Sequence, residues 1–332
     1  MPPLVTIITP TKNRLMLLGE AIDSVLAQTF SCWEHLIVDD GSDDGSIEMV
    51  QKLAASDSRI RLIKRTGEKA GANVCRNIGI RESRGEFLVF LDSDDLLAKT
   101  CLEQRVALMQ RNQDLDFAVF QTGFFVETLG DRHQQISSEM FGDDLRRFLS
   151  FEFPWIINAP IWRKGSQEKL QGFDETLPSW QDVDLHIRAI CRGLLYVKVP
   201  LLDHHVRWQY DETKVSVLQR RSPKHLHAAA AILEKFEVEI RCGPGMDWIR
   251  QRSLAGLYFL IAELWLNAGS LSSALDFWGK GHSRRLSNKR LYVSGCLLLL
   301  LLASPLPSSF SARIIHKWKG FARFRSNPSM LG

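Results

Sequence analysis

Short apolar runs alternate with segments of helical periodicity along the first hundred residues of the chain. The apolar runs lie at 4–9, 34–38, 59–64 and 86–91, and the first of them is rich in β-branched residues. Runs of this length, bounded by turn residues, are typical of buried strands. The segments between them have apolar residues at helical spacing and lie at 15–28, 46–55 and 70–83. Strand–helix alternation with short connections predicts an α/β fold with a mostly parallel central sheet flanked by helices.

The pattern becomes less regular beyond residue 98. The next expected elements are helices at 100–111 and 181–192 and strands at 116–125 and 201–208. From Ser222 onward the pattern is helical. A serine can cap the free N–H groups of a helix start and a proline fits its first turn, so Ser222-Pro223 predicts a helix start. Later helices are expected at 225–240, 248–268 and 272–281.

This change of pattern divides the chain into two expected domains. Residues 1–217 would form the α/β domain, with a regular half at about 1–98 and a less regular half at about 99–217. Residues 218–332 would form an all-α C-terminal extension. The length of 332 residues exceeds that of most single domains, which agrees with one large domain and an accessory region.

Charge is distributed unevenly between these parts. The formal net charge is +4, yet from Phe277 to the end the chain has ten Lys or Arg residues and no Asp or Glu. The preceding residues carry 32 bases against 38 acids. A basic C-terminal region predicts an anionic partner. Nucleic acid is not expected, because the sequence offers no groove-reading or base-stacking motif.

Two stretches of the C-terminal region bear on membrane association. The apolar run 291–303 contains six consecutive leucines, but its 13 residues are fewer than the roughly 20 that a spanning helix needs. Residues 309–325 combine aromatic side chains with Lys and Arg, a composition typical of segments that lie on an anionic membrane surface. An ordinary surface helix is the alternative for the second stretch.

The cysteines and the N-terminus indicate the compartment. Six cysteines are scattered without CxxC or metal-ligand spacing, which is typical of reduced, buried thiols. The first residues lack a basic segment followed by a long apolar core, so a signal peptide is not expected. We expect a cytoplasmic protein, bound peripherally to the cytosolic face of the inner membrane if the C-terminal region binds lipid.

Three polar clusters follow predicted strands at equivalent positions, namely 10–14, 39–44 and 92–95. In open α/β sheets, ligands bind at the carboxyl ends of the strands, so clusters at three such ends predict a binding site. The last cluster, Asp92-Ser93-Asp94-Asp95, offers three carboxylates. Mg²⁺ and Mn²⁺ are commonly held by one or two carboxylates together with substrate phosphates, so this cluster is a candidate metal site. A solvated acidic turn is the alternative.

Five motifs give the chain a family resemblance. They are IITPTKNR (7–14), HLIVDDGSDDGS (35–46), CRNIGIRESRGEFLVFLDSDD (75–95), GFDETL (172–177) and WQDVDLHIRA (180–189). In this order and approximate spacing they resemble the family 2 glycosyltransferases, inverting nucleotide-sugar transferases with the Rossmann-like GT-A fold. The resemblance covers about residues 4–216. It implies that the half at about 1–98 binds the nucleotide and the half at about 99–217 binds the acceptor.

The resemblance implies donor-binding roles for residues of the first three motifs. Asp40, the second acid of the DDGS motif, would contact the nucleobase. Arg76 would face the nucleotide. Asp92 and Asp94 would form the DxD motif that holds Mg²⁺ or Mn²⁺ on the diphosphate, with Asp95 beside them. The other donor-binding positions would be Pro10, Asn13, Arg14, Ser93 and Arg207.

The fifth motif contains the implied catalytic base. In the family the base is the Asp of a Glu-Asp pair that opens a helix, and here the pair is Gln181-Asp182. Asp182 would take the proton of the acceptor hydroxyl during in-line attack, giving inversion at the anomeric carbon. The change from Glu to Gln alters the electrostatic surroundings of this base. Asp184, on the same helix turn, is the fallback.

A second departure concerns the opposite wall of the implied site. The family often has an Arg-x-His element after the next strand, whereas this chain has Arg207-Trp208-Gln209. His204 or His205 could replace the missing histidine as a metal ligand. Neighbouring residues on a strand face opposite sides, so at most one of them points into the site. A structural role is the alternative for both.

We therefore expect an inverting, metal-dependent glycosyltransferase. It would move a sugar from a nucleoside-diphosphate sugar, with UDP as the expected nucleotide, to a glycan, lipid-linked or other acceptor in cell-surface polysaccharide or glycoconjugate synthesis. An impaired relative that binds nucleotide or glycan as a scaffold is one alternative. A sugar-nucleotide nucleotidyltransferase is disfavoured because the loop TPTKNR lacks the glycines expected of that class. A nicotinamide dehydrogenase is disfavoured because no GxGxxG follows the first strand.

Overall fold

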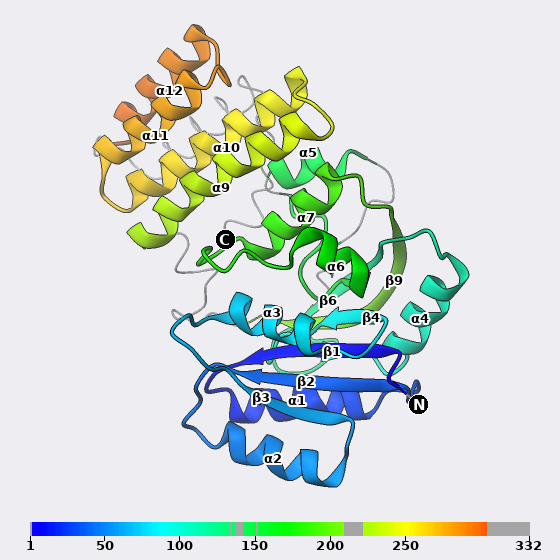
Figure 1. Ribbon diagram of the computed structural model, residues 1–332. Helices are drawn as coiled ribbons and strands as arrows, with labels where there is room; N and C mark the ends of the chain where they lie inside the picture. The colour runs from blue at the N-terminus through cyan, green and yellow to red at the C-terminus, as the bar shows by residue number, and fades with distance from the viewer. Residues whose placement is uncertain (1, 133–134, 137–141, 151, 209–221, 304–332) are drawn as a thin grey trace. The chain divides into compact units, whose positions relative to one another are not determined.

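The computed structural model describes residues 2–132, 135–136, 142–150, 152–208 and 222–303 (Figure 1). The chain divides into two compact units. The first comprises Met1–Gly142, Pro154–Thr176 and Gly193–Gln209, and the second comprises Asp143–Phe153, Leu177–Arg192 and Tyr210–Gly332. The sequence analysis placed one boundary after residue 217, whereas two segments that precede this boundary are part of the second unit.

The first unit contains a sheet with the strand order β3-β2-β1-β4-β8-β6-β9-β5, and β7 pairs with β6. Four neighbouring strands are parallel, namely β1 (Val5–Thr11), β2 (Trp33–Asp39), β3 (Ile60–Lys64) and β4 (Phe87–Phe90). Val5 lies opposite both Trp33 and Phe87 in register. The predicted strands are thus confirmed, and β1 continues far enough to include the buried Pro10.

Three helices connect the parallel strands: α1 (Leu15–Leu26), α2 (Ser46–Ser56) and α3 (Ala72–Glu82). The steps from β1 to β2 to β3 move one way across the sheet, and the step from β3 to β4 moves back. With right-handed crossovers, α1 and α2 must cover one face and α3 the other, as Figure 1 shows. Gly79 lets α3 lie directly on β1, because a Cβ there would be 2.4 Å from Cγ2 of Ile8.

The rest of the sheet is mixed. β8 (Pro160–Arg163) is antiparallel to both β4 and β6 (Phe117–Phe125), while β9 (Tyr196–Arg207) is parallel to β6. The two-residue strands β5 (Leu96–Leu97) and β7 (Gln135–Ile136) pair antiparallel with β9 and β6. The prediction of a mostly parallel sheet therefore holds for the first four strands and not beyond them. The sequence pattern does not predict β8, because the aromatic stretch around it has no clear period. It does not predict β5 or β7 either, because two residues are too few to show a period.

Aromatic stacking fixes the centre of the mixed half. The ring of Phe117 stacks on Trp162 and on Tyr196, with centroid separations of 4.2 Å and 4.8 Å. These three residues come from β6, β8 and β9, so the stack ties together strands that are distant in sequence. Helices α4 (Cys101–Arg111) and α6 (Lys164–Leu170) pack against this half, on β6 and β8.

The second unit is helical where the structure describes it. Its helices are α5 (Asp144–Leu149), α7 (Gln181–Cys191), α9 (Pro223–Cys242), α10 (Trp248–Asn267), α11 (Leu271–Ser283) and α12 (Lys289–Leu302). The last four confirm the predicted all-α C-terminal extension. The side chains of Asp247 and Ser270 cap α10 and α11. The indole of Trp278 donates a hydrogen bond to the carbonyl of Tyr292 at 3.0 Å, which joins α11 to α12.

None of the helices in the described part of the chain is both long and apolar enough to cross a bilayer. The apolar run predicted at 291–303 forms α12. This helix exposes Val293, Leu297 and Leu300, which lie at helical spacing on one face. The segment 309–325, predicted to bind membrane, lies outside the described residues.

Candidate functional site

The three polar clusters lie along one edge of the parallel half of the sheet. Thr11 and Asp39, the last residues of β1 and β2, are opposite each other in register. The pairing continues past the strands, since the N–H of Asp40 donates to the carbonyl of Thr11 at 2.9 Å. On the other side of β1, the N–H of Leu91 donates to the carbonyl of Ile8 at 3.0 Å. Because these strands are parallel, residues 10–14, 39–44 and 92–95 leave the sheet at the same edge.

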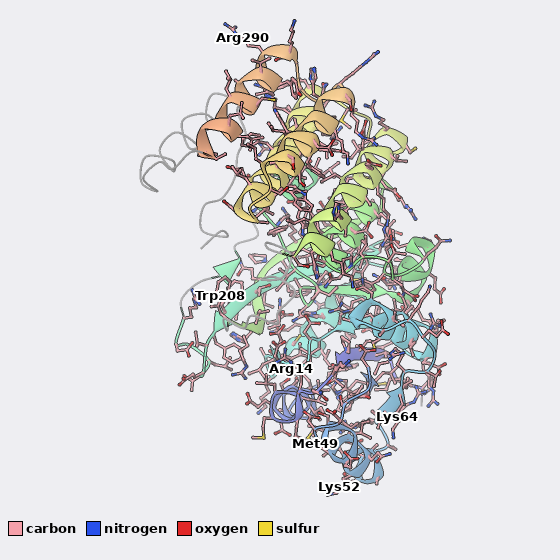
Figure 2. The ribbon with its side chains drawn as sticks, turned by 90° about the vertical axis from the view of Figure 1, so that its left-hand side faces the viewer. Arg14, Met49, Lys52, Lys64, Trp208 and Arg290 are labelled. Atoms are coloured by element: carbon pink, nitrogen blue, oxygen red, sulfur yellow. The ribbon has the colours of Figure 1, made fainter. Side chains whose placement is uncertain are left out.

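Hydrogen bonds join the loop after β1 to the loop after β2. Asn13 has a left-handed backbone (φ 52°), which asparagine tolerates better than most residues. Its N–H donates to Oγ of Ser42 at 3.0 Å, and its side-chain oxygen accepts from the N–H of Asp43 at 2.9 Å. Asp44 accepts from the first N–H of α1 at 2.9 Å. Asn13 thus shapes the implied nucleotide loop, and Arg14 follows it at the start of α1 (Figure 2).

Asp40, the implied contact of the nucleobase, is buried and hydrogen-bonded on both carboxylate oxygens. One oxygen accepts from the N–H of Gly71 at 3.0 Å, and the other pairs with the guanidinium of Arg65. Arg65 also donates to the carbonyls of Gly67 and Lys69, at 2.6 Å and 2.8 Å. The sequence analysis did not identify Arg65. Its position directly after β3, at the same edge as Asp40, is the signal that could have found it.

Arg76, on α3, reaches the first acid of the DxD motif. Its Nη2 lies 2.6 Å from Oδ1 of Asp92, and its guanidinium carbon lies 5.4 Å from the ring centroid of Phe173. The side chain of Arg76 is 3% exposed, whereas that of Asp92 is 32% exposed. The resemblance implies that Arg76 faces the nucleotide, and the structure pairs it with the carboxylate that is implied to hold the metal.

The turn that contains Phe173 is clamped to α3 by the amide of Asn77. The side-chain oxygen of Asn77 accepts from the N–H of Phe173 at 2.8 Å, and its nitrogen donates to the carbonyl of Phe173 at 2.8 Å. The same nitrogen lies 3.0 Å from Glu175, and Asn73 donates to the carbonyl of Asp174 at 2.9 Å. These contacts explain the GFDETL motif, which the sequence analysis quoted without a role.

Asp95 is buried and both of its carboxylate oxygens are engaged. One accepts from the backbone N–H of Arg207 at 2.9 Å, and the other accepts from the side-chain amide of Asn158. Burial, followed by the charges of Asp94 and Asp92, raises the pKa of Asp95 well above the usual carboxyl range. This geometry makes Asp95 a structural residue of the loop and does not favour it as a metal ligand.

Arg207 also holds the DxD loop through its side chain. Its Nε donates to the carbonyl of Asp94 at 3.2 Å, and its guanidinium pairs with Glu20 on α1. The guanidinium carbon lies 4.4 Å from the ring centroid of Phe125. Arg207 is therefore at the predicted site, where it joins α1, β9 and the DxD loop.

His204 and His205 differ in their surroundings, as neighbours on a strand should. His204 is fully buried, with Nδ1 at 2.9 Å from Asp203 and Nε2 at 2.8 Å from Oγ1 of Thr122. His205 is partly buried on β9. Burial lowers the pKa of both imidazoles. Because both ring nitrogens of His204 have partners, the geometry assigns it a structural role and does not favour it as a metal ligand.

The remaining acids fit a divalent cation that takes most of its ligands from a substrate. Within the described ranges, no group of three or more His, Cys, Asp or Glu residues could hold a metal ion. Asp92 and Asp94 are partly exposed and flank the buried Ser93. Mg²⁺ usually keeps several waters and binds through one or two carboxylates plus substrate phosphates. Asp92 and Asp94 would therefore hold such a metal together with a diphosphate.

The implied catalytic base lies in the second unit, in the first turn of α7. Asp182 is partly exposed, and its Oδ1 accepts from the N–H of Val183 at 2.9 Å. Asp184 is fully buried, and nitrogens of Arg188 and Lys235 each lie 2.8 Å from its carboxylate. A fully buried carboxylate that is paired with two cations is not accessible to an acceptor hydroxyl. The geometry therefore favours Asp182 over the fallback.

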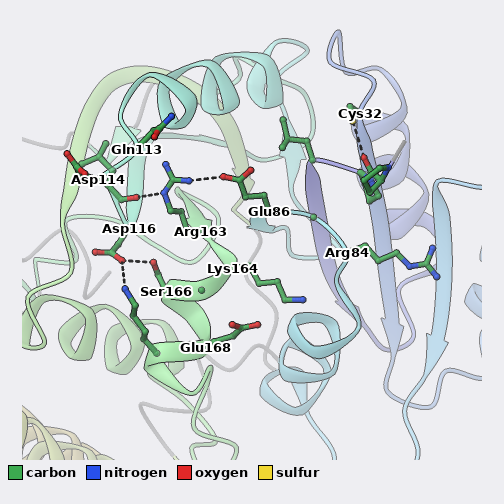
Figure 3. A pocket seen from close by; sticks show the side chains of 17 residues that line it. Cys32, Arg84, Glu86, Gln113, Asp114, Asp116, Arg163, Lys164, Ser166 and Glu168 are labelled. Atoms are coloured by element: carbon green, nitrogen blue, oxygen red, sulfur yellow. Dashed lines mark hydrogen bonds and ion pairs between the residues drawn. The ribbon is translucent and has the colours of Figure 1, made fainter.

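A hollow of about 970 Å³ lies at the opposite, amino edge of the sheet (Figure 3). Its lining includes Leu4 and Glu86, which precede β1 and β4. Charged side chains in the hollow pair with their neighbours: Arg163 lies 2.8 Å from Glu86, and Asp116 accepts from Ser166 at 2.6 Å. The implied donor-binding residues therefore lie at the edge away from this hollow.

The sequence profile of glycosyl transferase family 2 matches residues 6–168, which include all four parallel strands and the DxD motif. Residues 6–168 therefore form a glycosyl transferase family 2 domain. The similar proteins include the UDP-Glc:alpha-D-GlcNAc-diphosphoundecaprenol beta-1,3-glucosyltransferase WfgD of Escherichia coli. That protein is 42% identical over 110 residues, which are 33% of this chain and 42% of WfgD. The chain spans about half, or less, of the length of the curated relatives that it matches.

Solved structures confirm the GT-A type of fold for this chain. S. aureus TarS 1–349 in complex with UDP-GlcNAc has a TM-score of 0.65 at 17% identity, over 87% of this chain and 90% of that one. The mannosyltransferase PcManGT from Pyrobaculum calidifontis, in complex with GDP-Man and Mn²⁺, has a TM-score of 0.57 at 17% identity, over 91% of this chain and 86% of that one. At these identities the likeness concerns the fold alone.

Proposed function

We propose that this family 2 glycosyltransferase moves a sugar, with inversion, from a UDP-sugar to a hydroxyl of a lipid-linked glycan in polysaccharide or glycoconjugate synthesis. The observation that carries the proposal is the carboxyl edge of the parallel strands, where Asp40, Arg76 and the pair Asp92 and Asp94 come together in a family 2 domain. The E. coli relative is named for a UDP-glucose donor and a diphosphoundecaprenol-linked acceptor. TarS binds UDP and UDP-GlcNAc.

The donor-binding roles follow from the order of the loops. The nucleobase lies beside Asp40 and the loop shaped by Asn13, and the diphosphate lies beside Asp92 and Asp94. Mg²⁺ or Mn²⁺, when bound, neutralises the diphosphate and acts as a Lewis acid for the departing nucleotide. Mn²⁺ accompanies the donor in the PcManGT structure, which supports this part of the proposal. Arg207 positions the DxD loop through its hydrogen bonds to Asp94 and Asp95.

A donor screen tests the proposal. The full chain is incubated with a series of UDP- and GDP-linked sugars, Mn²⁺ and diphosphoundecaprenol-linked sugar acceptors, and nucleotide release and product mass are measured. We expect UDP release with an acceptor that gains one sugar. Absence of hydrolysis and transfer from every donor would overturn the proposal. Metal-dependent UDP binding without turnover would favour a nucleotide-binding scaffold, the alternative raised by Gln181 and the missing Arg-x-His element.

The assignment of the base has its own test. Asp182→Asn removes the proton acceptor and preserves side-chain size, so we expect turnover to fall by about 10² to 10⁴-fold. Affinity for UDP should be unchanged, because the donor residues lie on the first unit. Gln181→Glu, which restores the family's acidic pair, is the matched control and should retain turnover. Full activity of Asp182→Asn would reject this base without affecting the donor assignment.

We also propose peripheral binding to an anionic membrane through the C-terminal region. The region from Phe277 onward is basic without any acid, and Arg290 projects from α12 (Figure 2). The exposed Val293, Leu297 and Leu300 provide an apolar face on the same helix. Such a combination favours adsorption to anionic lipid, weakened by salt.

Vesicle co-sedimentation tests the membrane proposal. The full chain should sediment with vesicles that contain anionic lipid and not with purely zwitterionic vesicles. Deletion of residues 309–332 should weaken this binding, and added salt should weaken it further. Unchanged binding after the deletion would eliminate this segment as the anchor.

A further inference from the structure

Arg76 has few partners for a buried cation. Its side chain is 3% exposed, and among the described residues its one ion pair is with Asp92. Nη1 lies 3.5 Å from Oδ1 of Asn73, at the limit of a hydrogen bond, and Nε has no hydrogen-bond partner. Asp92 is therefore the countercharge on which burial of this arginine depends.

The surroundings of Arg76 keep its guanidinium in place. The ring of Phe173 lies against it, and both backbone groups of Phe173 are held by Asn77, one residue after Arg76 on α3. Gly79 seats the same helix directly on β1. Because α3 and the Phe173 turn are fixed, Arg76 remains beside Asp92 when that carboxylate acquires another ligand.

A divalent cation would compete with Arg76 for Asp92. Oδ1 of Asp92 is engaged by Arg76 at 2.6 Å, and the same carboxylate is the first proposed metal ligand. A metal that takes this carboxylate leaves a buried guanidinium without its countercharge, and an uncompensated buried charge is strongly unfavourable. The cost disappears if an anion arrives beside Arg76 together with the metal.

We infer that Arg76 makes metal binding conditional on the diphosphate of the donor. The diphosphate supplies oxygen ligands to the metal and an anionic partner to Arg76, so that metal and nucleotide bind as a pair. Without nucleotide, Arg76 occupies Asp92 and the metal binds weakly. Arg76 is thus a positioning residue that couples the two ligands. The inference rests on the proposed function, since it takes a nucleoside diphosphate as the ligand.

Calorimetry with Mn²⁺ in the absence of nucleotide tests this coupling on the full chain. Arg76→Met removes the competing charge, so we expect its affinity for Mn²⁺ alone to exceed that of wild type by about tenfold or more. Its affinity for UDP in the presence of Mn²⁺ should fall. Arg76→Lys, which keeps the charge, should remain close to wild type. Arg61→Met is the matched control, because Arg61 pairs with Glu34 at 2.9 Å and with no DxD residue.

The outcomes separate this inference from the proposed function. Equal affinities of wild type and Arg76→Met for Mn²⁺ alone would overturn the inference, while UDP binding by wild type with Mn²⁺ would leave the donor assignment standing. Absence of UDP binding by wild type would overturn both. If thermal melting shows that Arg76→Met is unfolded, Arg76→Gln serves instead, because it retains a hydrogen-bond donor beside Asp92 without the charge.

Discussion

A single residue, Gly172, supports the contacts that hold the Phe173 ring against Arg76. Its backbone is left-handed (φ 65°), and a Cβ on it would lie 2.4 Å from Oδ1 of Asn77. That oxygen is the one that accepts the N–H of Phe173. A side chain at residue 172 would therefore strain the backbone and push on the amide that holds the ring against Arg76.

Gly172→Ala should destabilise the protein by about 1–3 kcal/mol, because it combines a disfavoured backbone conformation with a steric clash. The free energy of unfolding in urea measures the effect. Gly165→Ala is the matched control, since a Cβ on Gly165 meets no atom within 4 Å and its φ is not positive. That control should be neutral or slightly stabilising, because alanine is the better helix residue. Equal stability of the two variants would contradict the role of residue 172.

A buried histidine predicts how stability depends on pH. His35 is fully buried in β2, and its Nε2 lies 2.8 Å from Oγ1 of Thr9. Burial lowers the pKa of His35 from 6.5 to about 3. The unfolded chain therefore binds a proton at a higher pH than the folded protein does. The stability that His35 contributes is fully present above about pH 6.5 and is lost as the pH falls towards about 3.

His35→Gln should reduce the slope of stability against pH over this range. In wild type, protonation of the unfolded His35 removes up to about 1.4 kcal/mol per pH unit, and glutamine has no such titration. Urea unfolding at about pH 6, 5 and 4 gives the two slopes. His186, also buried with a pKa lowered to about 3, is present in both proteins and cancels in the comparison. Parallel curves would contradict the prediction.

At the scale of elements, the sequence pattern predicts the parallel half of the fold and little of the mixed half. Helix α1 begins at the expected residue, Leu15. The polar loop that precedes Leu15 and the helical spacing of the apolar residues that follow it define this start. β8 could not be predicted, since its residues Pro160–Arg163 have no period of their own and owe their conformation to pairing with β4 and β6.

The site follows the same division. The carboxyl edge could be predicted, because loops after parallel strands must meet there. The partners of the site residues could not, since they come from distant parts of the chain: Asp95 contacts Asn158 and Arg207, and Asn77 contacts Phe173. Such pairs form only when the mixed half of the sheet assembles, so no local sequence pattern predicts them. The same applies to His204, whose neighbours Asp203 and Thr122 decide its structural role.

The packing of α3 on β1 gives a prediction at this scale. Gly79→Ala should destabilise the protein by about 1–3 kcal/mol, because its Cβ would overlap Ile8 and lift the helix that carries Arg76. It should also weaken UDP binding. Gly19→Ala on α1 is the control, since a Cβ there would meet Met49 at an ordinary 3.7 Å. Wild-type stability and UDP affinity in Gly79→Ala would contradict this account of the helix.

At the scale of the whole molecule, the residues proposed for donor binding and the proposed base belong to different units. The proposed donor residues Asp40, Arg76, Asp92 and Asp94 are in the first unit, and Asp182 is in the second. The chain passes from one unit to the other repeatedly, so that α7, which carries Asp182, lies in sequence between two segments of the first unit. Donor binding and proton transfer can therefore be tested by separate substitutions.

Turnover of the donor with and without the metal ion tests the central claim most directly. UDP release from the active UDP-sugar is measured for wild type, with Mn²⁺ and after treatment with EDTA, and for Asp92→Asn and Asp94→Asn. We predict that chelation and each substitution lower turnover by on the order of a hundredfold or more, and that Mn²⁺ restores the chelated wild type alone. Undiminished turnover after chelation and in both variants would contradict the assignment of the carboxyl edge as the donor site.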